Sequence, residues 1–257
     1  MARSVLAVSV VLFVSSLTIS QTTVSDPQAQ SLAMKSVTAL TGGTAVSDIT
    51  LNATVTSILG SDNQTGTADL TAKGLSSSRT DLNLSNGEIR SDVRTSTNGQ
   101  GGGAWKKSDS APVVYANHNC KTDAAWFFPA LSSLTQTTSP NFVFKYIGQE
   151  QHGGVNTQHI LVFQKSLTNL LQHLSTIDFY LDPTSALPLA IAFQMHPDND
   201  AARDIPAEVR FADYRSINGV LVPFHVQKML NGGVIFDITV TSATLNTGLP
   251  DTTFNIQ

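Results

Sequence analysis

The chain has 257 residues, of which 41% are hydrophobic and 13% are charged, against roughly 25% charged residues in ordinary soluble domains. Its formal net charge is -4, so it lacks the basic electrostatic footprint of a nucleic-acid-binding protein. The single cysteine, Cys120, excludes an intramolecular disulfide framework and a cysteine-rich zinc site. Because Ser and Thr supply roughly a fifth of the residues, we expect hydroxyl groups rather than ions on the surface.

Residues 1–20 have the pattern of a secretory signal peptide. Arg3 gives a positive start, an apolar run follows, and Thr18 and Ser20 are small residues that suit a cleavage site. The apolar run is shorter than the roughly 20 residues that span a bilayer. We therefore expect cleavage and a single exported domain over residues 21–257, with an uncleaved N-terminal anchor as the alternative.

The mature chain is expected to be periplasmic or secreted. No Cys follows the apolar run, so a lipoprotein lipobox is absent. No later apolar segment approaches bilayer length, which predicts a mature chain without a transmembrane segment.

The first element predicted after the signal peptide is a helix. Asp26 can cap its N-terminus, and Pro27 suits the first helical position. From Leu32 onward the apolar side chains keep a helical spacing, which ends at the stop signal Thr41-Gly42-Gly43. A helix over residues 27–41 follows from these signals.

Alternation with a period of two begins directly after this helix. Apolar residues at positions 49, 51, 53 and 55 alternate with Thr and Asn, which describes a strand with one wet face. Residues 68–72 and 82–84 continue the same pattern, with turn residues between the runs. This part of the chain predicts an antiparallel meander.

The middle of the chain is less regular. Residues 98–103 are rich in glycine and predict a flexible loop that leads to Trp105. Residues 126–129, Trp-Phe-Phe-Pro, are the densest aromatic cluster in the sequence. Pro129 either breaks the chain there or starts a short helix that runs to about Leu134.

Leu167, Leu170, Leu171 and Leu174 fall at i, i+3, i+4 and i+7, which is the apolar stripe of an amphipathic helix. Ser166 is a suitable cap for this helix. A helix this short is not stable alone in water, so its stripe needs an apolar surface to rest on. It is either ordinary cover over a sheet or a movable lid over a cavity.

The remaining strand candidates share β-branched or aromatic residues between turn signals. They are residues 142–147, 157–163, 177–181, 188–193, 208–214, 220–230 and 234–240. Asn218-Gly219 separates two of them and is the signal of a two-residue hairpin. With about ten strands, a few helices and no break in composition, the sequence predicts one mainly β domain.

The C-terminal half carries a string of short motifs. They are Phe179–Thr184, Leu187-Pro188, Val209–Arg215, Ile217–Val220, Val222–Phe224, Leu245-Asn246 and Asp251–Phe254. This string resembles the secreted bacterial proteins with a LolA/LolB-like fold, the outer-membrane lipoprotein carrier group and its uncharacterised relatives. The resemblance implies a mainly β (α+β) fold, in which a curved antiparallel sheet forms an incomplete barrel around a hydrophobic cavity. An N-terminal helix and one or two short covering helices complete it.

No catalytic or metal-binding spacing stands out. The histidines form neither HExxH nor HxH; they are His118, His152, His159, His173, His196 and His225. His118 and Cys120 would share a face if they lay in a strand, as a Cys/His dyad requires, with a polar loop histidine beside a small core cysteine as the alternative. Asp198, Asp200 and Asp204 lack the ligand series of a calcium loop and predict a solvated turn. We assign no catalytic residue, cofactor or metal.

The resemblance, the leucine stripe and the aromatic cluster together favour a non-enzymatic exported protein. Its ligand would be the acyl chain of a lipid or lipoprotein, or another apolar molecule. We expect the cavity or its lid to be lined by Trp126, Phe127, Leu131, Leu167 and Leu171. A structural or envelope-assembly protein, whose half-barrel is filled by its own side chains, is the alternative, and a secreted enzyme is a third hypothesis. The sequence identifies no protein partner.

Overall fold

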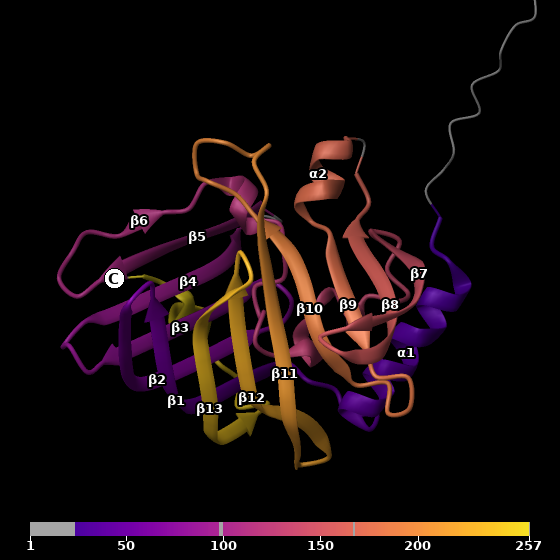
Figure 1. Ribbon diagram of the computed structural model, residues 1–257, viewed down its shortest axis with the longest axis horizontal. Helices are drawn as coiled ribbons and strands as arrows, with labels where there is room; N and C mark the ends of the chain where they lie inside the picture. The colour runs from indigo at the N-terminus through magenta and orange to yellow at the C-terminus, as the bar shows by residue number, and fades with distance from the viewer. Residues whose placement is uncertain (1–23, 98–99, 167, 257) are drawn as a thin grey trace, which may run out of the picture.

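The computed structural model describes residues 24–97, 100–166 and 168–256 (Figure 1). The predicted signal peptide and Leu167 therefore lie outside the described residues. Within them, thirteen strands form one curved antiparallel sheet that does not close into a barrel. One N-terminal helix and a few short helices accompany the sheet. The predicted fold class is confirmed.

The strands are β1 (Asp48–Leu59), β2 (Asp62–Lys73), β3 (Ser77–Leu84), β4 (Ile89–Thr97), β5 (Gln100–Lys107), β6 (Val113–Val114), β7 (Phe142–His152), β8 (Val155–Gln164), β9 (Ile177–Leu181), β10 (Pro188–Met195), β11 (Ile205–Ile217), β12 (Val220–Leu230) and β13 (Gly233–Leu245). The helices are α1 (Pro27–Thr41) and α2 (Asn169–Leu174), and the short 3-10 turns are η1 (Asn117–Cys120), η2 (Pro129–Leu131), η3 (Ser133–Thr135) and η4 (Asp251–Phe254). In the described part of the chain no helix has the length and apolarity needed to cross a bilayer.

The sheet consists of two meanders joined by their first and last strands. The strand order is β6-β5-β4-β3-β2-β1-β13-β12-β11-β10-β9-β8-β7. Only the β1–β13 pair joins strands that are distant in the chain, with Ile49 opposite Leu245 and Ser57 opposite Phe236. As a result β6 and β7 form the two opposite edges, although they follow one another in sequence.

Helix α1 forms where the sequence predicts it. The Asp26 side chain accepts a hydrogen bond from the backbone N of Gln28 at 2.8 Å, and Pro27 takes the first helical position. Gly42 ends the helix in the left-handed conformation at φ 58°. The buried face is made of small residues and Leu40, and it packs against β7, β8 and β12.

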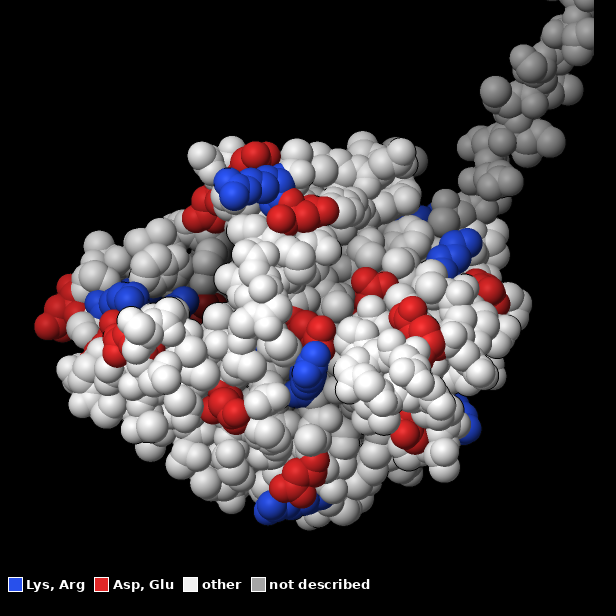
Figure 2. Space-filling model, viewed as in Figure 1, with Lys and Arg blue, Asp and Glu red and all other residues white. Residues whose placement is uncertain are grey.

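Alternation along the strands separates the core from the surface as predicted. Ile49, Leu51, Ala53 and Val55 are at most 5% exposed and join one hydrophobic core with the inner residues of the other strands. The hairpin between β11 and β12 turns at Asn218-Gly219, where both residues have positive φ. Figure 2 shows charged side chains as scattered groups on a mostly uncharged face, in keeping with the low charge of the sequence.

The loop predicted at residues 98–103 is wrong for residues 100–103, which form the first half of β5. Its glycines permit close approach rather than flexibility. A Cβ on Gly101 would lie 2.3 Å from the carbonyl oxygen of Cys120, and one on Gly103 would lie 2.5 Å from that of Val93. The sequence could not show these close contacts, because they involve a distant segment and a neighbouring strand. Glycine content alone therefore predicted a loop.

Helix α2 is shorter than the leucine stripe predicts. Its cap is Thr168, whose hydroxyl accepts from the backbone N of Leu171 at 3.3 Å, and Ser166 lies outside the helix. Of the described leucines in the stripe, Leu174 is buried, whereas Leu170 and Leu171 are 51% and 42% exposed. The apolar face of α2 is therefore covered only at its C-terminal end.

A buried carboxylate fixes the junction of β1 and β13. Asp48 is 1% exposed and accepts hydrogen bonds from the backbone N of Thr247 at 2.8 Å and of Gly248 at 3.1 Å. The hydroxyls of Ser47 and Thr247 donate to it as well. Burial alone raises the pKa of Asp48, but the four hydrogen bonds outweigh it, and the net pKa is below the ordinary value of 3.8.

We expect Asp48→Asn to lower the free energy of unfolding by about 1–3 kcal/mol at pH 7, because its amide N–H₂ would face backbone N–H donors. Since the folded-state pKa is depressed, the contribution of Asp48 is present above pH 3.8 and is lost as the pH falls through the folded pKa. Urea unfolding of both proteins from neutral to acidic pH measures this, and the gap between them should narrow in acid. Asp69→Asn, at an exposed carboxylate that accepts from Asn52, is the control. Equal losses in the two variants would contradict the assignment.

Candidate functional site

Residues 115–141, here called the crossing segment, connect β6 to β7 and must pass from one edge of the sheet to the other. They do so across the inner face, where the core lies. Phe127, Phe128 and Leu134 are fully buried, and Leu131 is 5% exposed. The turns η2 and η3 in this segment pack against α1. The segment therefore fills much of the space that the curved sheet encloses.

Trp126 lies at the border of the core that the buried residues of the crossing segment form. Its ring meets that of Phe127 edge to face at 5.5 Å, and Nζ of Lys228 lies 4.3 Å from its centroid. Trp126 also lines a cavity of about 40 Å³, together with Phe193 and Met195 of β10. The crossing segment and the sheet thus each contribute apolar surface to the cavity, whose other lining residues are polar or charged: Arg94, His118, Asn119, Thr122, Asp123, Gln194 and Lys228.

A second cavity, of about 150 Å³, adjoins the first. Both are lined by Arg94, Thr122 and Asp123, so these residues form the partition between them. We call the two cavities and their lining the Trp126 site. Arg94 holds the partition in place, because its Nη2 donates to the carbonyl of Thr122 at 3.2 Å.

The Trp126 site contains charged groups whose pKa values are shifted by burial. Burial lowers the pKa of Lys228 to about 8, although the carboxylate of Asp92 opposes the shift. Burial raises the pKa of Asp123 to about 6, although the Ser133 backbone N and hydroxyl donate to it at 2.8 and 2.9 Å. At neutral pH the site therefore combines two cations, Arg94 and Lys228, and the carboxylate of Asp123 with the aromatic face of Trp126.

A third cavity, of about 440 Å³, lies elsewhere. It is lined by Pro183 and by polar residues of the β7–β8 hairpin, which are Gln149, Glu150, Gln151, Asn156 and Thr157. This lining does not fit an acyl chain, which needs apolar walls.

The structure brings three of the five predicted ligand-binding residues together in the crossing segment. Trp126 forms a cavity wall, whereas Phe127 and Leu131 pack in the core. Leu171 stands apart on α2 with its side chain exposed, and Leu167 lies outside the described residues.

Sequence reasoning missed Arg94 and Lys228. Lys228 had a usable signal, because it continues the inward-facing series of Val222, Phe224 and Val226 in β12. A lysine at such a position needs a partner, which here is Trp126. Arg94 carried no comparable signal.

The structure does not assemble a Cys/His dyad. His118 and Cys120 lie in the turn η1 and not in a strand. Nε2 of His118 is 3.0 Å from the carbonyl of Pro197, and burial raises the pKa of the Cys120 thiol, which disfavours the nucleophilic thiolate. Asp198, Asp200 and Asp204 are exposed in the connection between β10 and β11, in keeping with the predicted solvated turn.

Comparison with known proteins supports the fold. No family model and no curated protein matches the chain. Among solved structures it is similar to a putative outer membrane lipoprotein-sorting protein domain from Vibrio parahaemolyticus, at TM-score 0.57 and 11% identity over 89% of this chain and 96% of the other. A DUF1329 family protein from Desulfovibrio piger matches at TM-score 0.56 and 12% identity, over 89% and 96%. A LolA superfamily protein from Nitrosomonas europaea matches at 0.52 and 12%, over 89% and 97%. The chain therefore has the LolA-like fold that the motif string implied.

The contact between Lys228 and Trp126 predicts a fluorescence titration. In a Trp105→Phe variant, where Trp126 is the remaining tryptophan, we expect its emission to change with a midpoint at about pH 8 as the ammonium loses its proton. Adding Lys228→Met should abolish this transition. A transition of the same midpoint in both variants would contradict the assignment.

Proposed function

We propose that the protein is a non-enzymatic exported binding protein that holds a lipid acyl chain or another apolar ligand inside its half-barrel. The observation that carries the proposal is the Trp126 site, a pair of cavities between the crossing segment and the sheet, where Trp126, Phe193 and Met195 give the smaller cavity its apolar surface. The fold shared with a putative lipoprotein-sorting domain supports it. Residues 21–257 would act as one periplasmic or secreted domain after cleavage of the signal peptide.

Binding requires the crossing segment to move. The cavities of about 40 and 150 Å³ are smaller than the roughly 300 Å³ at which ligand sites begin. If Trp126, Phe127 and Leu131 shift outward, an acyl chain takes their place against the inner face of the sheet. The ligand exchanges water for this apolar surface at about 0.8 kcal/mol per CH₂, on the order of 10 kcal/mol for a twelve-carbon tail before ordering and association costs.

The two ends of such a ligand would meet different groups. Arg94 and Lys228 favour an anionic head group at the Trp126 site, because they bring two cations to a lining that holds one carboxylate, Asp123. Leu170 and Leu171 offer exposed apolar surface on α2, which suits a lid that closes over the tail.

One observation favours a second candidate, a structural or envelope-assembly protein without a ligand. Phe127, Phe128 and Leu134 are already fully buried, so the half-barrel is filled by its own side chains. In this case the exposed leucines of α2 would contact a protein partner instead of a ligand.

Native mass spectrometry of the exported protein, followed by solvent extraction, separates the two candidates. Lipid binding predicts a mass above that of the denatured chain and an acyl-chain lipid in the extract. If no lipid is recovered and the dye anilinonaphthalene sulfonate does not bind, the acyl-chain proposal is rejected in favour of the second candidate.

The proposed lid predicts a mutational effect. Leu171→Asp should reduce lipid recovery several-fold, since burying a charge against an acyl chain is unfavourable. Leu59→Asp is the matched control, because Leu59 is a leucine of similar exposure, 49% against 42%, at the end of β1. Equal recovery from the two variants would remove Leu171 from the ligand site.

A further inference from the structure

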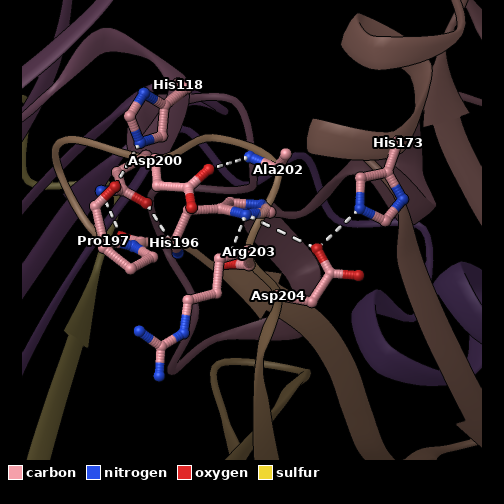
Figure 3. Close-up of polar contacts among 9 residues, drawn as sticks. His118, His173, His196, Pro197, Asp200, Ala202, Arg203 and Asp204 are labelled. Carbon is pink, nitrogen blue, oxygen red and sulfur yellow. Dashed lines mark hydrogen bonds and ion pairs between the residues drawn. The ribbon is translucent and has the colours of Figure 1, made fainter.

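Two imidazoles and a carboxylate that are distant in sequence meet where α2 stands beside the turn between β10 and β11 (Figure 3). His173 comes from the last turn of α2, His196 directly follows β10, and Asp204 directly precedes β11. Nε2 of His173 lies 2.8 Å from Oδ1 of Asp204, and Nδ1 of His196 lies 3.6 Å from the same oxygen. One ligand atom from each residue lies within 4.8 Å of the other two.

These distances suit a common metal ion. A tetrahedral zinc ion with bonds of about 2.0–2.1 Å holds its ligand atoms about 3.3 Å apart. The separations of 2.8 and 3.6 Å lie on either side of that value. The side chains of His173 and Asp204 are 45% and 42% exposed, so they can make the small adjustment that ligation requires.

His196 is the fixed member of the cluster. Its side chain is 1% exposed, and its Nε2 has no hydrogen-bond partner within the described residues. Nδ1 faces the carbonyl of Arg203 at 3.2 Å, and the backbone N donates to Asn119 at 3.0 Å. Ligation through Nδ1 requires the ring proton to move to Nε2, which gives up the 3.2 Å bond to the Arg203 carbonyl and leaves the Nε2–H without an acceptor among the described residues.

We infer that His173, His196 and Asp204 form a binding site for a divalent transition metal, with Zn²⁺ as the ion that fits the donors best. Imidazole nitrogen and carboxylate oxygen are both normal zinc ligands, and three protein ligands leave the fourth position to water or to an incoming group. The site goes beyond the proposed function and does not depend on it.

Metal binding at this site would fasten α2 to the sheet. His173 belongs to the helix, whereas the other two ligands belong to the β10–β11 connection, so the ion bridges two elements. The helix has few other attachments, since Leu174 is buried but Leu170 and Leu171 are exposed. Zinc should therefore slow amide hydrogen exchange in residues 169–174.

A second His–Asp pair provides a matched control. Nε2 of His225 lies 2.8 Å from Oδ1 of Asp237, with side-chain exposures of 39% and 37%. This pair has the geometry of His173 and Asp204 without a second imidazole in the group. His225→Ala therefore removes a comparable ion pair and leaves the three proposed ligands intact.

The test is titration of the chelator-treated, metal-free protein with Zn²⁺ by calorimetry and with Co²⁺ by visible absorption. We expect one ion per chain, and His173→Ala and Asp204→Asn should each weaken binding by about tenfold or more, since even the loss of an outer-shell partner has an effect of that size. His225→Ala should bind like the unmodified protein. Slower exchange in residues 169–174 with zinc should occur in the unmodified protein and not in His173→Ala.

Absence of binding by both ions overturns the inference, as does unchanged binding in both His173→Ala and Asp204→Asn. Both substitutions are at exposed side chains, and Asp204→Asn preserves shape, so thermal unfolding should confirm that the variants fold. The titration uses no lipid. Its failure would leave the acyl-chain proposal standing, and the lipid extraction could fail while the zinc site holds.

Discussion

The backbone hydrogen bonds between β1 and β13 join the two meanders of the chain, and the rest of the architecture depends on them. Once these strands pair, β6 and β7 become opposite edges of one sheet. The chain between them has no route along the sheet and must cross its inner face. Asp48 stabilises the same junction by accepting hydrogen bonds from the residues that follow β13. The interior is thus filled by a connection rather than by strand side chains alone.

Because a connection fills the interior, that connection is the part of the core that would move in ligand binding. The crossing segment can separate from the sheet without breaking the hydrogen bonds between neighbouring strands, although bonds such as those from Arg94 to Thr122 and between Asn119 and His196 would be lost. Trp126, at the border of the segment, is held by Phe127 and Lys228 and faces a cavity. Replacing part of the segment by a ligand exchanges one apolar contact for another, so the net gain comes from the ligand's own transfer out of water. The proposed ligand-bound state and the closed core therefore differ in the position of the crossing segment and share the same sheet.

Short sequence signals correctly predicted the ends of α1 and the β11–β12 hairpin, because these features depend on interactions between neighbouring residues. The cap at Asp26, the stop at Gly42 and the Asn218-Gly219 hairpin each depend on a few neighbouring residues, and the structure contains all three. The glycines of β5 were misinterpreted because their close contact with Cys120 comes from the crossing segment. The motif string predicted the LolA-like fold, but it could not place Arg94 against Thr122 or His173 beside His196, since those approaches follow from tertiary packing.

The Trp126 site and the His173–His196–Asp204 cluster lie close enough to influence one another. His196 stands between them, with its ring centroid 5.9 Å from that of His173 on one side and 5.9 Å from that of His118 on the other. His118 lines the smaller cavity, and η1, which carries it, is tied to the β10–β11 turn through Asn119 and Asp198. An ion that fixes His196 and α2 would therefore also restrict the start of the crossing segment, whose movement the proposed ligand binding would require. Such coupling needs no long pathway, because a single buried imidazole contacts both sites.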